Sequence, residues 1–170
     1  ANTQLLEFHA KTLVPSSSGT HMFVGRGLSA YFGSTVELAN GTGTDPATTF
    51  DGGAATDDLL QNLFIVPINL TIDAVKFMVS TITDTDCTIN VHLYSFDMTN
   101  AGGTSDGNLT NGTLLANGQA TAVDRNVIKT IDCSIDSANV TANKVIACFV
   151  ENETNTDSIM LQTQVLYHFD

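Results

Sequence analysis

Four histidines are the side chains whose type best suits a catalytic base near neutral pH. A nucleophilic enzyme holds such a base beside a serine or cysteine. His9, His92 and His168 each lie between apolar neighbours, on the polar side of an alternating stretch, and His21 opens a short apolar one. No pattern sets a histidine beside a buried carboxylate, and no G-x-S-x-G elbow occurs. We therefore predict that the chain has no catalytic triad and is not an enzyme.

Carboxylates and aromatic residues are the groups that act on or bind sugars. A glycoside hydrolase needs two carboxyl groups facing each other across the scissile bond. Glu7, Glu37, Glu151 and Glu153 supply carboxyl groups, but their positions indicate no such pair. Sugar-binding modules favour aromatic platforms, and this chain has no Trp and three Tyr. Its six N-x-[ST] sequons are expected by chance in a chain rich in Asn and Thr.

Metal-binding spacings are rare in the sequence. No H-x-x-x-H, C-x-x-C or H-E-x-x-H pattern points to zinc, and no EF-hand loop occurs. Asp84 and Asp86 are the calcium candidates, since Ca²⁺ favours carboxylate and carbonyl oxygens. Aspartates are also frequent in turns, where the side chain bonds the local backbone. We favour the turn interpretation and predict no metal and no cofactor.

The three cysteines follow the phase of buried residues. Cys87, Cys133 and Cys148 each alternate with apolar side chains of a predicted strand. An odd number of cysteines in such positions is typical of buried free thiols rather than of a disulfide framework. One disulfide with a leftover thiol is the alternative.

Charge excludes two classes of partner. The chain of 170 residues has 18 Asp and Glu against 6 Lys and Arg, a net charge of −12. This field repels nucleic-acid phosphates and anionic lipids. No apolar run reaches the roughly 20 residues of a membrane helix, and the first residues show no signal-peptide pattern. We predict neither a nucleic-acid nor a membrane partner.

Short alternating stretches dominate the rest of the sequence and predict strands, with one possible helical turn over 56–62. Their number and spacing predict an all-β, antiparallel β-sandwich of jelly-roll style, forming one domain over 1–170 with long polar loops at 40–57 and 97–108. The predicted strands cover residues 6–14, 21–24, 28–38, 63–67, 70–81, 87–96, 114–122, 127–135, 144–151 and 158–169.

Two consecutive stretches resemble a known class of protein. Residues 63–80 combine an F-x-x-P strand with a V-K-F-x-V-S strand, and residues 87–94 contain T-I-N-V-H-L-Y. The strands at 27–32 and 162–167 have the same style. This pattern resembles virion structural proteins of tailed bacteriophages, of the decoration, head-fibre or knob, and tail-appendage types.

The resemblance implies assembly rather than catalysis. It implies a non-enzymatic protein located in the virion and assembled in the host cytoplasm, with other capsid or tail proteins as partners and a homo-oligomeric state. The first strand is a candidate docking arm over 1–14, although it also fits an ordinary first strand. Its interface candidates are Leu5, Leu6, Phe8 and Leu13. The alternative is a secreted or cell-surface β-sandwich binding module, lectin-like or adhesin-like and extracellular.

Overall fold

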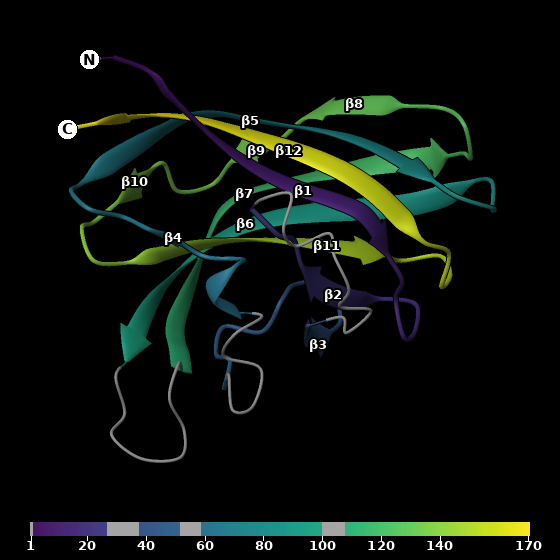
Figure 1. Cartoon of the computed structure of the whole chain (residues 1–170), viewed down its shortest axis with the longest axis horizontal. Coiled ribbons are helices and arrows are strands. Elements are labelled where there is room, and N and C mark those ends of the chain that lie inside the picture. The colour runs from purple at the N-terminus through teal and green to yellow at the C-terminus, as the bar shows by residue number, and fades with distance from the viewer. Residues whose placement is uncertain (1, 27–37, 52–58, 100–107) are drawn as a thin grey trace.

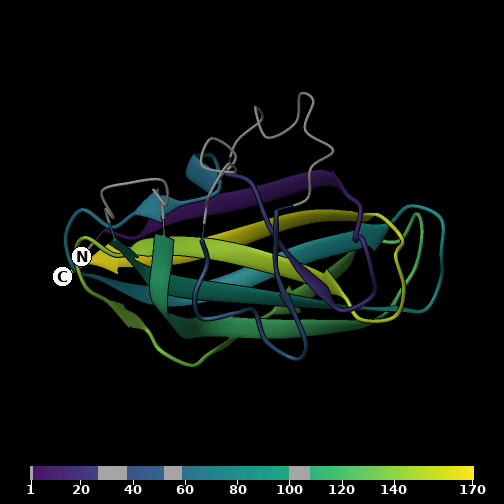
Figure 2. The ribbon, with the colours of Figure 1, turned by 90° about the horizontal axis from the view of Figure 1, so that it is seen from below.

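The computed structural model is nearly all β and describes residues 2–26, 38–51, 59–99 and 108–170. Its two antiparallel sheets pack face to face as a sandwich, so the predicted fold class is confirmed. The long strands run roughly side by side along the longest axis of the molecule (Figures 1 and 2). None of the described residues belongs to a helix that is long and apolar enough to cross a membrane.

The first sheet has the order β1-β12-β5-β10, with β8 also paired to β5. Its central strand, β5, is bonded to β12 along one edge and to β10 and β8 along the other. The strands of this sheet are β1 (Gln4–Leu13), β5 (Leu70–Thr81), β8 (Lys129–Asp132), β10 (Asn139–Val140) and β12 (Ile159–Phe169).

The second sheet has the order β3-β2-β11-β6-β7-β9, with β4 also paired to β11. In Figure 1, β2 and β3 lie below the long strands. The strands of this sheet are β2 (Thr20–Phe23), β3 (Ala39–Thr42), β4 (Phe64–Ile65), β6 (Cys87–Thr99), β7 (Asn108–Val123), β9 (Ser134–Ile135) and β11 (Val145–Asn152).

Most of the predicted strands are present. The stretch 28–38 lies almost wholly outside the described residues, and of the helical turn at 56–62 the described part is closed by a bond from Asn62 N to Leu59 O. The prediction of an unbroken loop over 40–57 was wrong, because residues 39–42 add a short strand to β2. The predicted loop at 97–108 is shorter than expected, since β6 continues to Thr99.

The predicted strand at 127–135 was also wrong, because it splits between the two sheets. β8 pairs with β5 in the first sheet, whereas β9 pairs with β7 in the second. Cys133 lies at the crossing, where its amide donates to Val75 O at 2.8 Å. The segment therefore covers one side of the sandwich, which reduces the exposed sheet edges.

The main core fills the space between the two sheets. Alternate residues of β5, β6 and β12 point inward, as the period-2 pattern predicts. Phe8 from β1 and Phe77 from β5 are fully buried there. The three cysteines are free thiols, as predicted, with Cys87 and Cys148 fully buried and Cys133 partly buried.

A second, smaller core covers the outer face of the second sheet. Phe96 and Phe149 stand on this face and are fully buried, with 6.1 Å between their ring centroids. They pack with Phe23 of β2 and with Leu59 and Leu63, which precede β4. The second sheet is therefore buried on both faces along much of its length. The near-continuous apolar run of β11 is the sequence signal for this double burial.

The turn after β5 is held by one carboxylate. Asp157, almost fully buried in the segment before β12, accepts hydrogen bonds from the backbone amides of Thr83, Asp84 and Ser158 and from the Thr83 hydroxyl. Burial acts to raise the pKa of the Asp157 carboxyl, but these hydrogen bonds outweigh it and lower that pKa below its usual value. Asp157 thus joins the β5–β6 turn to the β11–β12 connection.

Candidate functional site

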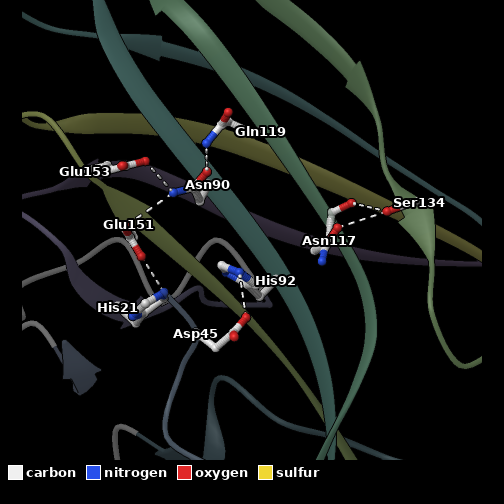
Figure 3. A network of polar contacts seen from close by, with 9 residues as sticks. All are labelled: His21, Asp45, Asn90, His92, Asn117, Gln119, Ser134, Glu151 and Glu153. Carbon is white, nitrogen blue, oxygen red and sulfur yellow. Dashed lines mark hydrogen bonds and ion pairs between the residues drawn. The ribbon is translucent and has the colours of Figure 1, made fainter. Parts of the chain in front are cut away.

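A row of polar side chains crosses four strands on the outer face of the second sheet, beside the second core. We call these four residues the polar row: His21 of β2, Glu151 of β11, Asn90 of β6 and Gln119 of β7. Asn90 lies opposite Glu151 on one side and opposite Gln119 on the other. Met22 lies opposite Val150, which makes His21 and Glu151 neighbours as well. Figure 3 shows the row running across the strands.

His21 and Glu151 form the buried end of the polar row. His21 Nε2 faces Glu151 Oε2, and the two side chains are 0% and 3% exposed. The contact is an ion pair when His21 is protonated. The sequence interpretation, in which no histidine lies beside a buried carboxylate, was therefore wrong. His21 is held inside because its strand, β2, is buried at all four positions.

His92 lies beside this pair, on the same face of the sheet. Its ring meets the His21 ring edge-on, with 5.2 Å between centroids, and its Nε2 is 3.5 Å from Asp45 Oδ1. His92 stands on the polar-phase side of its strand, as predicted, but its side chain is only 7% exposed. The reason is that the segment carrying Asp45 covers this part of β6. His92 Nδ1 is buried without a hydrogen-bond partner among the described residues.

Electrostatics favour a neutral His92. Burial, and next the neighbouring His21, lower the pKa of the His92 imidazole below its usual value. Asp45, Glu151 and Asp136 act in the opposite direction without reversing the shift.

The exposed end of the polar row is fixed by amide hydrogen bonds. Asn90 Nδ2 donates to Glu151 Oε1 and to Glu153 Oε2, each at 3.2 Å. Gln119 Nε2 then donates to Asn90 Oδ1 at 2.9 Å. In the neighbouring row, Asn117 lies opposite His92, and Ser134 donates to Asn117 Oδ1 at 2.9 Å. Figure 3 draws these bonds as dashed lines, together with the His21–Glu151 and His92–Asp45 contacts.

Together these side chains line an open groove of about 590 Å³. Its floor consists of β6, β7 and β11, and one wall consists of the segment that follows β3. The described residues that line it are all polar or glycine. They are Ser18, Gly19, Thr42, Gly43, Thr44, Asp45, Asn90, His92, Asn117, Gly118, Gln119, Glu151 and Glu153.

The groove was not predicted from the sequence, although one signal for it is readable. Glu151 shares the phase of Phe149 on β11, and that phase is buried. A carboxylate in a buried phase calls for a partner that donates hydrogen bonds or carries positive charge. The identity of that partner depends on which strand lies beside β11. The alternation pattern does not give the order of the strands in the sheet.

The other site candidates lie apart from the groove. Asp84 and Asp86 occupy the β5–β6 turn, where Asp84 Oδ2 accepts from Asn155 Nδ2 at 3.0 Å and the Asp86 amide donates to Asp124. Among the described residues, no group of three or more His, Cys, Asp or Glu side chains is placed to hold a metal ion. Glu7 accepts from two glutamines on the outer face of the first sheet. Glu37 lies outside the described residues.

The interface candidates belong to an edge strand of the first sheet. β1 pairs with β12 from Gln4 to Leu13, in the position of an ordinary first strand. Leu6 and Phe8 are core residues, and Leu13 packs partly buried against the core. Leu5 points outward and is 52% exposed, opposite Leu166 of β12. Leu5 is therefore the member of the set that faces solvent most.

Comparisons with known proteins give only weak similarities. No protein-family model and no curated protein matches the sequence. A structure of infectious bursal disease virus Gx strain aligns at 7% identity and a TM-score of 0.40, over 99% of this chain and 32% of that chain. The present chain thus spans about a third of the length of that viral chain.

Two other similar structures are close to this chain in length. The CBM22-1 xylan-binding domain of Paenibacillus barcinonensis Xyn10C aligns at 9% identity and a TM-score of 0.35, over 98% of this chain and 94% of that one. Naturally occurring empty particles of cowpea mosaic virus align at 12% identity and a TM-score of 0.30, over 100% and 86%. Scores this low describe a general likeness and indicate no shared function.

Proposed function

We propose that this chain is a non-enzymatic structural protein of a virus particle, which decorates a phage capsid or tail or forms an appendage on it. The observation that carries the proposal is the place of the segments that resemble phage virion proteins. Residues 63–80 and 87–94 supply β4, β5 and the first part of β6. These strands contribute to both sheets, so the resemblance concerns the framework of the sandwich and not an isolated surface feature.

The most buried histidine–carboxylate pair of the described residues suits a structural role. A catalytic histidine must reach both its nucleophile and its substrate. His21 is fully buried, and its neighbour Glu151 is nearly so. A buried pair of this kind suits the positioning of neighbouring strands better than proton transfer to a bound substrate.

The outer face of the first sheet suits docking to other virion proteins. Leu5, Leu166 and Ala74 form an exposed apolar row across three neighbouring strands. Beside them, Gln162 and Gln164 donate to Glu7, so this carboxylate is hydrogen-bonded within the face. Such a face fits packing against another protein, and a homo-oligomer would repeat the contact around a symmetry axis.

The test is to locate the protein on virus particles. Particles are purified from the natural source of the chain, labelled with an antibody raised against it, and analysed by quantitative mass spectrometry. The expected result is labelling at fixed positions and a constant copy number per particle. Native mass spectrometry of the free chain should give a closed multiple of 18.0 kDa. A glycosylated monomer absent from particles would contradict the proposal and favour the secreted binding module.

A further inference from the structure

The amide groups of Asn90 and Gln119 are held in known orientations, and this determines what they present to a ligand. The carboxylates of Glu151 and Glu153 can only accept hydrogen bonds from Asn90, so the Asn90 atom between them is the amide nitrogen. Asn90 Oδ1 must then accept from Gln119 Nε2. Gln119 Oε1 is left as an acceptor on the exposed end of the row.

A donor lies beside that acceptor. Asn117 Oδ1 accepts a hydrogen bond from the Ser134 hydroxyl at 2.9 Å, and no described residue bonds the Asn117 Nδ2 group. Asn117 and Gln119 are two residues apart on β7, so both side chains project from the same face of the strand. An acceptor and a two-hydrogen donor therefore stand next to each other at the groove. Each of these two amide groups already makes a hydrogen bond within the protein. This reduces the conformational entropy that is lost when a ligand binds.

The charge of the groove selects against anions. Asp45 and Glu153 line it as carboxylates, and none of the described residues that line it is a lysine or arginine. Phosphate, sulfate and carboxylate groups would meet like charge there. A metal ion would require a cluster of ligands, and the described residues contain no group of three or more that is placed for one.

From these features we infer that the groove binds a neutral carbohydrate. Sugar hydroxyl groups both donate and accept hydrogen bonds, so neighbouring hydroxyls match the alternating acceptors and donors of Gln119, Asn117 and the two carboxylates. A volume of about 590 Å³ lies in the range of small-molecule sites. This inference goes beyond the proposed virion role and does not depend on it.

The described residues of the groove lining contain one ring, the imidazole of His92, and its side chain is 7% exposed. A sugar finds little ring surface to stack on there, so hydrogen bonds in competition with water supply the affinity. A single groove should therefore bind in the millimolar range. Several grooves on one oligomer would raise the apparent affinity by avidity.

The test uses the full chain, biotinylated and bound to streptavidin, on an array of neutral, sialylated and sulfated glycans. The expected result is binding to neutral glycans alone. Titration of the ¹⁵N-labelled chain with the strongest neutral glycan should shift the side-chain amide signals of Asn117 and Gln119. Binding only to anionic glycans, or to none, would overturn the inference, as would a preference for a lysine-rich peptide tested in parallel.

Two variants and a matched control place the ligand in the groove. Gln119→Ala and Asn117→Ala should each lower the array signal at least tenfold. Gln164→Ala removes an equivalent strand glutamine from the outer face of the first sheet and should leave the signal unchanged. Thermal melting checks that each variant is folded. An equal loss in all three variants would overturn the placement. Antibody labelling of particles does not depend on glycans, so failure of this inference is distinguishable from failure of the virion proposal.

Discussion

The imidazole rings of His21 and His92 meet edge-on, with 5.2 Å between their centroids, inside one buried polar cluster. Two histidines this close cannot both carry a proton in a buried site without repulsion. Asp45, Glu151 and Asp136 oppose that repulsion, and the pKa of His92 nevertheless stays below its usual value. The fold therefore favours the neutral form of His92.

Acid should destabilise the protein through His92. An unfolded histidine takes up its proton near pH 6.5, whereas the folded His92 does so only at a lower pH. The unfolded state then binds more protons between these two values. The contribution of His92 to the free energy of unfolding is thus fully present above about pH 6.5. It falls as the pH drops toward the folded pKa, by at most about 1.4 kcal/mol per pH unit. Urea unfolding at a series of pH values measures this slope.

Two variants separate His92 from the other histidines. His92→Gln should flatten the slope between pH 6.5 and 5, because the titrating group is gone. His9→Gln removes a half-buried histidine on β1, so comparing the slopes of the two variants separates His92 from a histidine outside the groove. An unchanged slope in His92→Gln would show that His92 does not carry the effect.

Asp157→Asn should weaken the connection between the β5–β6 turn and β12. An amide has one acceptor oxygen and brings two hydrogens toward backbone amides that now donate to the carboxylate. Leaving buried donors unpaired costs about 2–3 kcal/mol of unfolding free energy. Chemical denaturation at pH 7 measures the loss. Asp84→Asn is the matched control in the same turn, because its carboxylate accepts one side-chain bond, from Asn155.

The Asp157 effect should disappear in acid. Its folded pKa is lowered, so its stabilising effect is present above the unfolded pKa of about 3.9 and is lost as the pH falls through the folded value. The difference between wild type and Asp157→Asn should therefore shrink below about pH 4. A difference that stays constant down to pH 2 would contradict the role of the ionised carboxylate.

Gly118→Ala should overpack the main core. A Cβ atom at this position would lie 2.8 Å from Cys133 Sγ and 2.9 Å from Phe77 Cε1. Both neighbours are packed side chains, so the methyl group costs about 1–3 kcal/mol. A lower melting temperature measures the cost. Adding Cys133→Ala should recover part of it by removing the nearer contact. No recovery would locate the strain elsewhere.

The thiols should be unreactive while the protein is folded. Burial raises the pKa of both Cys133 and Cys148 to about 12, so neither forms much thiolate at pH 8. Cys87 is fully buried as well. Ellman's reagent should therefore find almost no thiol in the native protein and three per chain in guanidinium chloride. Rapid modification of the folded chain would contradict this burial.

Alternation along the chain predicts most strands but not their neighbours. Val75, Phe77 and Val79 show the period of two that places them in the core, and all three are buried. Asp132 and Ser134 are likewise two residues apart and share a phase, yet they lie in β8 and β9, which belong to different sheets. A period of two gives the face of a side chain and carries no information about which strand lies beside it.

The polar groove is hidden from sequence reasoning for the same reason. His21, Glu151 and Asn90 are distant in the sequence and meet only because β2, β11 and β6 are adjacent. His92 looks exposed because its phase is polar at Asn90. It is buried because the segment around Asp45 lies over it, and that is a property of tertiary packing.

The pairing of β1 with β12 has a consequence for synthesis of the protein. Gln4 lies opposite Tyr167, so the first strand leaves the ribosome long before its partner exists. At about 5–20 residues per second, the wait is roughly 8 to 30 seconds. During that time the apolar side chains of β1, including Phe8, have no sheet to join. Completion of the first sheet therefore waits until β12 has left the ribosome, and the nascent chain exposes the apolar face of β1 to other chains until then.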